Sequence, residues 1–306
     1  MSDPTVSAPA VDETEPAAPT PRAGADVVVG VPLGGRAGAA VHWAAAEARD
    51  RGVALRLVHG LVVPRGGYPG RSFVGVDAEQ GLFLLARQEL RDMRLVARDV
   101  APDLPIVEDL VESDPVAVLR AQARFASLLV LGSDGFGRLG ELALGRTTRG
   151  LAGEVAVPVV LVPHHCDARA RERAEGHAPV VVGDDGSEGC RGALQFAALR
   201  AECRGSPLVV VRASKDVRLL GEDVPELGSA RPPGVRVVLA EERADRVLAD
   251  QARDAELVVL GVGEHGRLRH RHPRTRPGVV RRATCPVAIV PPGPTRRSED
   301  AGRPRS

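Results

Sequence analysis

The sequence lacks several of the features with which proteins bind strongly negative partners. Aromatic residues make up 2% of its 306 residues, and Lys215 is the only lysine. The 41 basic and 40 acidic residues nearly cancel, to a formal net charge of +1. Binding to nucleic acid or to an anionic membrane surface needs a clustered basic region. We therefore expect neither as a partner, and we expect small molecules or proteins instead.

Long hydrophobic runs are absent as well. The longest, such as 155–162, is far shorter than the ~20 residues that a membrane-spanning helix needs. Residues 1–24 are mainly proline, alanine, threonine and acidic residues rather than a basic and apolar leader. We therefore expect a cytoplasmic protein. Because residues 1–24 and 293–306 contain few large apolar groups, both are predicted to be disordered tails.

Cysteine is scarce, and no cysteine has the spacing of a metal-binding or redox pair. We expect four reduced structural thiols, two of them on one predicted helix: Cys166, Cys190, Cys203 and Cys285. The histidines near 164 and 270 have no closing ligand at tetrahedral spacing, so no metal site is predicted. No Ser-His-Asp or Cys-His set occurs at an informative spacing. The sequence therefore predicts no catalytic residue, and we do not expect an enzyme.

An internal repeat is the most informative feature that is present. The segment VVVG at 27–30 returns 153 residues later, at 180–183. The segment LLVLG at 128–132 returns as LVVLG after only 129 residues, at 257–261, so about 24 residues are missing from the second copy. Trp43 against Phe196 and Gly52 against Gly205 follow the first offset. A repeat of this length indicates two copies of one domain.

Each copy alternates apolar runs with helical patterns. In the first copy the predicted strands are 27–31, 55–63, 106–111, 128–132 and 159–162, and the predicted helices are 37–51, 77–100, one opened by Ser113-Asp114-Pro115, and 146–154. Unbroken Val and Leu runs between helices are typical of a parallel sheet buried on both faces. The predicted fold class is α/β, with two tandem domains, each a Rossmann-like parallel five-strand sheet covered by helices on both faces.

The repeat also sets the predicted domain boundaries. They are a first domain at 25–164, a linker at 165–177 and a second domain at 178–292. The second domain is truncated, because the segment 213–234, rich in proline and glycine, stands where the first copy has its long helix. We predict that this segment is mobile and leaves the adjacent face of the sheet partly uncovered.

One loop of the first copy has the pattern of a phosphate site. Gly132 and Gly135 follow a predicted strand, and Gly145 opens a predicted helix that begins with Arg146 and Thr147. Glycines let a ligand approach the backbone closely, and the free N–H groups at a helix start favour phosphate. The loop lies beyond the carboxyl ends of the strands, where α/β sheets usually bind ligands. Two turn glycines without a ligand are the alternative explanation of this pattern alone.

Together with the order of elements and the last strand after Ala156-Val157-Pro158, this loop resembles the phosphate signature of the universal stress protein family. That signature is Gly, two residues, Gly, nine residues, Gly, then Ser or Thr. The resemblance implies a stress-response module that binds ATP, with the phosphates at Gly132, Gly135, Gly145, Arg146 and Thr147, and with Mg²⁺ only when ATP is bound. It also implies that the last strands of the two copies pair, as an intrachain pseudo-dimer.

Both copies depart from the family pattern. In the first copy the Ser or Thr position is Arg146, and the acidic residue that helps to hold the nucleoside falls on Pro32. The second copy keeps that acid as Asp185, but Glu264 replaces the second glycine, and Pro273 or Arg274 the third. We therefore expect an adenine nucleotide in the first domain only. The alternative is a degenerate scaffold that binds no nucleotide and acts through contacts with an unidentified protein. Slow ATP hydrolysis would also need a metal and a water-orienting group that the sequence does not identify.

Overall fold

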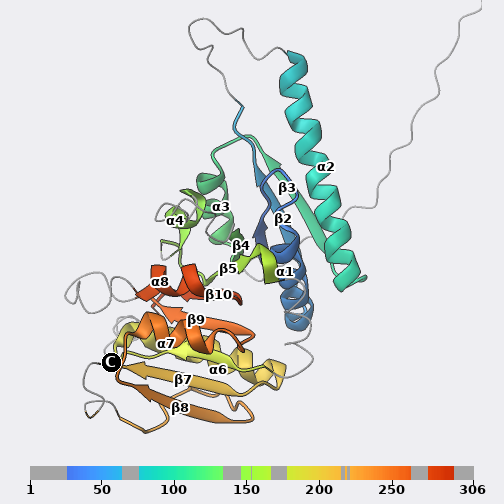
Figure 1. The fold of residues 1–306 in the computed structure, drawn as a ribbon. Coiled ribbons are helices and arrows are strands. Elements are labelled where there is room, and N and C mark those ends of the chain that lie inside the picture. The colour runs from blue at the N-terminus through green and yellow to red at the C-terminus, as the bar shows by residue number, and fades with distance from the viewer. Residues whose placement is uncertain are drawn as a thin grey trace, which may run out of the picture.

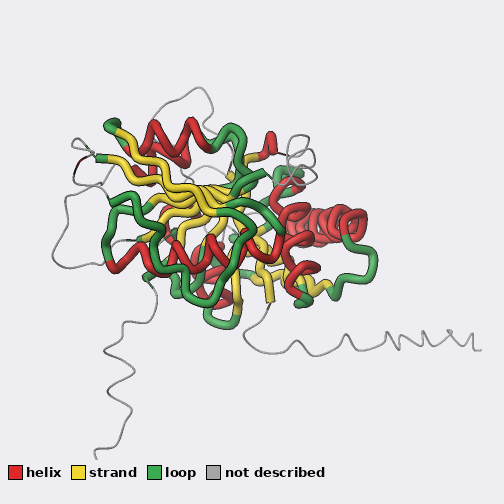
Figure 2. Tube along the Cα trace, turned by 90° about the horizontal axis from the view of Figure 1, so that it is seen from below, coloured by secondary structure: helices red, strands yellow, loops and turns green. Residues whose placement is uncertain are grey.

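The computed structural model describes residues 26–63, 76–133, 146–152, 154–166, 178–214, 218, 221–262 and 275–292. The predicted tails, the linker from 167 on and the loop 134–145 lie outside these residues. Ten strands form one continuous sheet, with helices on both of its faces (Figures 1 and 2). None of the described helices is long and apolar enough to cross a bilayer.

The first half of the chain, residues 26–166, follows the predicted order of elements. They are β1 (Asp26–Gly30), α1 (Gly38–Arg51), β2 (Leu55–Gly60), α2 (Val76–Val100), β3 (Ile106–Val111), α3 (Pro115–Ala123), β4 (Ala126–Ser133), α4 (Arg146–Leu151), β5 (Val159–Pro163) and the short 3₁₀ turn η1 (His164–Cys166). The Asp114 carboxylate caps α3, since it accepts from the N–H groups of Val116 and Ala117 at 3.1 and 3.2 Å. The local sequence Ser113-Asp114-Pro115 therefore starts the helix where predicted.

The second half, residues 178–292, repeats this order without a counterpart of α2. Its elements are β6 (Val180–Gly183), the 3₁₀ turn η2 (Glu188–Cys190), α6 (Arg191–Arg204), β7 (Leu208–Ala213), β8 (Val235–Ala240), α7 (Ala244–Gln251), β9 (Leu257–Gly261), α8 (Thr275–Arg282) and β10 (Val287–Val290). Between β7 and β8, the described residues form no α-helix. Ala230 of that segment is 2% exposed, and Leu227 packs against the same core cluster, so these residues cover part of the sheet face that α2 covers in the first half.

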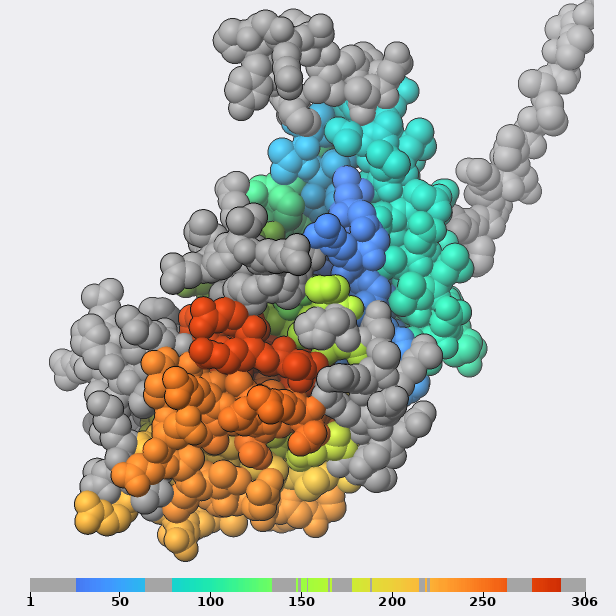
Figure 3. Space-filling model, in the orientation of Figure 1, coloured from blue at the N-terminus to red at the C-terminus, as the bar shows by residue number. Residues whose placement is uncertain are grey.

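The strand order of the sheet is β3-β2-β1-β4-β5-β10-β9-β6-β7-β8. Every strand pair described is parallel except β5 with β10, which is antiparallel. In that pair Val160 lies opposite Ala288. The sequence predicts this contact between the two last strands, and it is confirmed. Pairing covers the edge that each strand would otherwise leave open. Figure 3 shows the surface of the chain around the two buried strands, yellow-green at the end of the first half and red at the end of the second, side by side.

The core consists of one apolar cluster on each face of the sheet, and each cluster runs through both halves. On one face the buried residues come from α1, α2 and α6, and on the other from α3, α4, α7 and α8. Successive residues of one strand point to opposite faces and so belong to different clusters, as Val160 and Leu161 of β5 do. Coverage on both faces explains why the strands are apolar without interruption.

Three predicted boundaries are wrong by a few residues. The strand predicted at 55–63 ends at Gly60, where the start of α3 lies so close that a Cβ on Gly60 would meet the Pro115 Cα at 2.7 Å. The helix predicted at 146–154 ends at Leu151. Cys190 lies in the η2 turn before α6 rather than in the helix that holds Cys203. None of the four cysteines, all of them described, forms a disulfide, and only Cys203 is exposed.

Candidate functional site

The predicted site lies at the carboxyl ends of β1 and β4, where the strand order reverses. β1 pairs with β2 on one side and β4 on the other, which makes this edge the switch point at which α/β sheets bind ligands. Gly30 lies opposite Leu131 in the β1–β4 pair, so Pro32, just after β1, and Gly132, near the end of β4, come to the same edge. Pro32 is exposed there.

The remaining members of the predicted phosphate loop are described only in part. Gly135 and Gly145 lie outside the described residues. Arg146 is the first residue of α4, and Thr147, the next, is half-buried. The structure therefore describes the two ends of the loop, Gly132 near the end of β4 and Arg146 at the start of α4, and the phosphate site stays a prediction.

A carboxylate from α2 holds the loop between β1 and α1. The N–H groups of Gly34 and Gly35 donate to the two oxygens of Glu89, at 3.1 and 2.9 Å. Both glycines have positive φ, 99° and 70°, a conformation that other residues adopt rarely. Sequence reasoning missed Glu89, because nothing in the local pattern of α2 indicates which exposed acid faces this loop.

His59 is a second residue that sequence reasoning missed. It lies at the end of β2, is 5% exposed, and its Nδ1 donates to the carbonyl oxygen of Val31 at 2.7 Å. The bond to a carbonyl requires the proton on Nδ1, which leaves Nε2 as an acceptor in the neutral ring. Nε2 is buried and has no hydrogen-bond partner among the described residues. The first half therefore keeps a buried ring nitrogen without a hydrogen-bond partner next to the loop that carries Pro32.

The second half fills the equivalent edge with its own side chains. Asp184 and Arg212 stand 153 residues after Val31 and His59, the offset of the first repeat. The Arg212 Nε donates to Asp184 Oδ2 at 2.8 Å, and its Nη1 donates to the carbonyl oxygens of Gly221 and Asp223 at 2.6 and 2.9 Å. The guanidinium thus ties the strand ends to the segment that replaces α2.

Asp185, at the family's nucleoside position, is bonded within its own turn. Its Oδ1 accepts from the Ser187 N–H and from the Cys190 thiol, each at 3.0 Å. Burial of the thiol, together with its bond to Asp185, raises the pKa of Cys190 to about 12. The residue that looks most like the family's ligand-binding acid therefore stabilises the start of α6.

The two signature glycines differ in the space around them. A Cβ on Gly132 would meet the Arg36 carbonyl oxygen at 3.5 Å, an ordinary contact. A Cβ on Gly261, the equivalent of Gly132, would meet the Gly189 carbonyl oxygen at 2.9 Å and the Cys190 Cα at 3.2 Å. The backbone of the η2 turn therefore lies directly against Gly261, whereas the first half has room at Gly132. Within the described ranges, no three His, Cys, Asp or Glu side chains gather in a way that could hold a metal ion.

Comparisons with known proteins identify the family and the fold. The model of the universal stress protein family matches residues 26–163. A universal stress protein of Mycobacterium tuberculosis is 31% identical over 272 residues, which cover 81% of this chain and 89% of that protein. One of Mycolicibacterium smegmatis is 28% identical over 267 residues, covering 79% and 87%. The crystal structure of a universal stress protein from Archaeoglobus fulgidus shares the fold, with a TM-score of 0.66 at 16% identity, over 88% of this chain and 96% of that one. The chain belongs to the universal stress protein family.

Proposed function

We propose that the chain is a tandem universal stress protein whose first half binds ATP and whose second half does not. The phosphates lie against Gly132, Gly135 and Gly145 and the backbone of Arg146 and Thr147. The space around Gly132 is the observation that carries the proposal, because a Cβ there makes only ordinary contacts, whereas a Cβ on Gly261 would meet the backbone of the η2 turn. The position at the switch point of the sheet supports the same assignment.

The second half differs at each point that matters for a nucleotide. The η2 turn lies against Gly261, and the Asp185 carboxylate is engaged with Ser187 and Cys190. The Arg212 guanidinium is bonded to one carboxylate and two carbonyl groups of its own half. Opening a site there would break these contacts. One nucleotide per chain is the expected stoichiometry.

Binding in the first half depends more on the phosphates than on the nucleoside. Pro32 supplies no side-chain acceptor for the ribose or base, whereas Arg146 can make a charge-assisted contact to phosphate in place of the family's hydroxyl. Mg²⁺ enters with ATP rather than as a resident ion. A module of this kind acts in the cytoplasm, where ATP is available.

Thermal unfolding in the presence of ATP tests the proposal. A ligand at 100 times its dissociation constant stabilises the folded state by about 2.7 kcal/mol. We expect a rise in the melting temperature of the wild type with ATP and Mg²⁺, and no rise for Gly132→Ala, because the added methyl occupies the space that the phosphate needs. Gly132→Ala itself should fold, since its Cβ makes only an ordinary contact.

The matched control is Gly234→Ala in the second half, where a Cβ meets nothing within 4 Å. It should keep the full response to ATP. If millimolar ATP leaves the wild-type melting temperature unchanged, with and without Mg²⁺, the binding function is wrong and the scaffold that acts through protein contacts takes its place.

A further inference from the structure

The contact between the two halves is symmetric in its strand register. Val160 and Ala288 are 128 residues apart, the same offset that aligns Pro158 with Pro286, so they occupy equivalent positions of the two copies. They lie opposite each other in the β5–β10 pair, and Val159 with Ile289 and Leu161 with Val287 flank them. When two equivalent halves meet about a twofold axis, a residue on the axis meets the equivalent residue of the other half. The pseudo-twofold axis therefore passes between Val160 and Ala288.

Two further equivalent residues meet on the face of the sheet that carries α1 and α6. Glu47 and Arg200 are 153 residues apart, the offset that aligns Gly52 with Gly205, which end their helices with φ of 65° in both cases. The Glu47 Oε2 lies 3.0 Å from the Arg200 Nη1, and the two side chains are 2% and 8% exposed. A buried ion pair thus joins one position of the fold to the same position in the other half.

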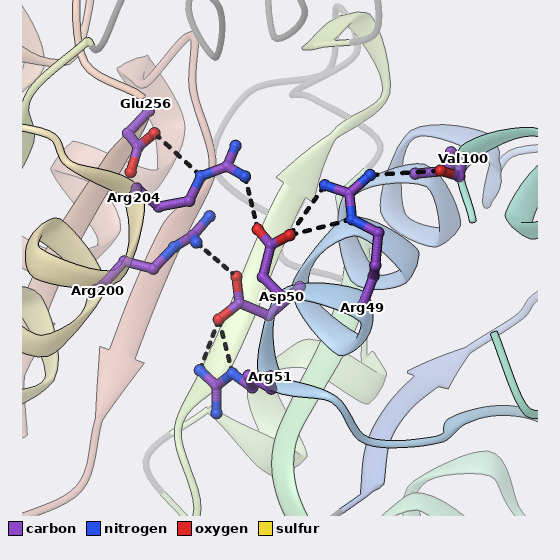
Figure 4. Close-up of polar contacts among 8 residues, drawn as sticks. Arg49, Asp50, Arg51, Val100, Arg200, Arg204 and Glu256 are labelled. Carbon is purple, nitrogen blue, oxygen red and sulfur yellow. Dashed lines mark hydrogen bonds and ion pairs between the residues drawn. The ribbon is translucent and has the colours of Figure 1, made fainter. Parts of the chain in front are cut away.

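Neighbouring contacts surround this pair. Figure 4 shows the polar ones, which lie at the ends of α1 and α6. The Arg51 Nε donates to Glu47 Oε1 at 2.8 Å, and the Arg204 Nη1 donates to Asp50 Oδ2 at 2.6 Å. The equivalent aromatic residues take part as well: the Arg200 guanidinium lies 5.7 Å from the ring centre of Trp43, and that of Arg51 lies 6.0 Å from that of Phe196.

The charges at the axis have opposite sign in the two halves, and this has a consequence for pairing. If two first halves met through this surface, Glu47 would face a second Glu47. If two second halves met, Arg200 would face another Arg200. Each arrangement places two like charges at the axis, which is less favourable than the Glu47–Arg200 pair even though Arg51 stays beside Glu47 as a counter-charge. Only the pairing of a first half with a second half brings opposite charges together at the axis position itself, as Glu47 and Arg200.

We propose that Glu47 and Arg200 select the pairing of the first half with the second half, and exclude pairing of like halves between chains. The partner that this surface fits is the other half of the same protein. The two charges act by repulsion in a pair of like halves as much as by attraction in the mixed pair. It does not depend on nucleotide binding.

The test compares the three possible pairs directly. A specific protease site is inserted into the full chain between 170 and 171, and the folded protein is cut there. The cut protein is unfolded in urea and refolded by dilution. Native mass spectrometry then separates mixed pairs from pairs of like halves by mass. Random association gives roughly half mixed pairs. The wild type should give almost only mixed pairs. Glu47→Gln with Arg200→Gln should lower this preference on the order of tenfold, whereas the reversed pair Glu47→Arg with Arg200→Glu should keep it.

A second measurement uses the uncut chain. Glu47→Arg alone and Arg200→Glu alone should each lower the urea midpoint, and the double variant should recover part of the loss, because it restores opposite charges at the axis but not the contact of Arg51 with position 47. Either of two results overturns the proposal: the glutamine double variant keeps the wild-type preference for mixed pairs, or the losses of the two single reversals simply add.

Discussion

Asp184 and Arg212 form an ion pair of 2.8 Å at the ends of β6 and β7, in the positions that Val31 and His59 hold in the first half. In both halves this contact joins the ends of two neighbouring strands. In the first half it is a single bond from an imidazole to a carbonyl group, and in the second it is a buried ion pair that also binds a neighbouring segment. The same place in the fold thus carries a much larger electrostatic interaction in the second half.

Removing the Arg212 guanidinium should therefore be costly. Asp184 is 7% exposed, and without Arg212 its carboxylate keeps the hydrogen bond from the Gly186 N–H but loses its counter-ion. We expect Arg212→Met to lower the free energy of unfolding by roughly 3 kcal/mol, because it leaves a buried charge without its counter-ion. The matched variant His59→Met loses one neutral hydrogen bond and should cost about 1 kcal/mol. Urea unfolding measures the loss of stability in both variants. Equal losses would contradict the larger electrostatic interaction in the second half.

The space around the signature glycines predicts opposite effects of one small substitution. Gly261→Ala should destabilise the fold by roughly 1 to 3 kcal/mol, since its Cβ would come within 2.9 Å of the Gly189 carbonyl oxygen, a backbone atom that cannot rotate away. Gly132→Ala should leave stability within about 0.5 kcal/mol. Differential scanning calorimetry without ligand checks the comparison. A larger loss for Gly132→Ala than for Gly261→Ala would contradict it.

Much of the fold could be predicted from the repeat, because each copy places the same apolar runs and caps in the same order. The contact of 159–162 with 286–290 followed from the exposed last strand of each copy. The side chains at the site could not be predicted in the same way. Glu89 reaches the Gly34-Gly35 turn, and Glu47 reaches Arg200, across long stretches of sequence, and only the packing of helices on the sheet decides which charged residues meet. Asp185 matched the family position, yet its carboxylate is bonded to Ser187, just before the η2 turn, and to Cys190 at the end of that turn.

Glu256 predicts a pH dependence of stability. Its side chain is 8% exposed, and burial raises the pKa of its carboxyl above the ordinary value, against the opposing effect of Arg200 and Arg204. An acid with a raised pKa in the folded state contributes stability that is complete below its unfolded pKa, about 4.3, and is lost as the pH rises through the folded pKa. Glu256→Gln should therefore be more stable than the wild type at pH 7.

This gain should disappear at pH 4, where the wild-type carboxyl is largely protonated in the folded state. Urea unfolding at the two pH values measures it. Glu202→Gln, at an exposed position of α6, is the control and should show no such difference. A wild type more stable than Glu256→Gln at pH 7 would mean that the ion pair with Arg204 outweighs the cost of burial.

The four thiols should differ sharply in reactivity. Cys203 is exposed, whereas the other three are buried, and the pKa of Cys190 is raised to about 12, so almost none of it is thiolate at neutral pH. We expect one fast-reacting thiol per chain with an aromatic disulfide reagent, and four after unfolding in urea. Cys203→Ser should remove the fast reaction. Rapid modification of Cys190 in the Cys203→Ser variant would contradict this prediction.

The segment between β7 and β8 provides a test of local stability. Among the described residues of this segment, few are anchored, chiefly Ala230 and Leu227 in the core and the carbonyl groups that Arg212 binds. Amide hydrogen exchange in 221–234 should therefore be faster than in β7, and Arg212→Met should accelerate it further at Gly221 and Asp223. Exchange as slow as that of the strands would show that the segment is held as firmly as the helix it replaces.

Calorimetric titration of the whole chain with ATP and Mg²⁺ tests the difference between the two halves most directly, because it counts the sites. We predict one ATP per chain, a binding signal lost in Gly132→Ala and kept in Gly234→Ala. Two sites per chain, or a single site that survives Gly132→Ala, would contradict the assignment of nucleotide binding to the first half.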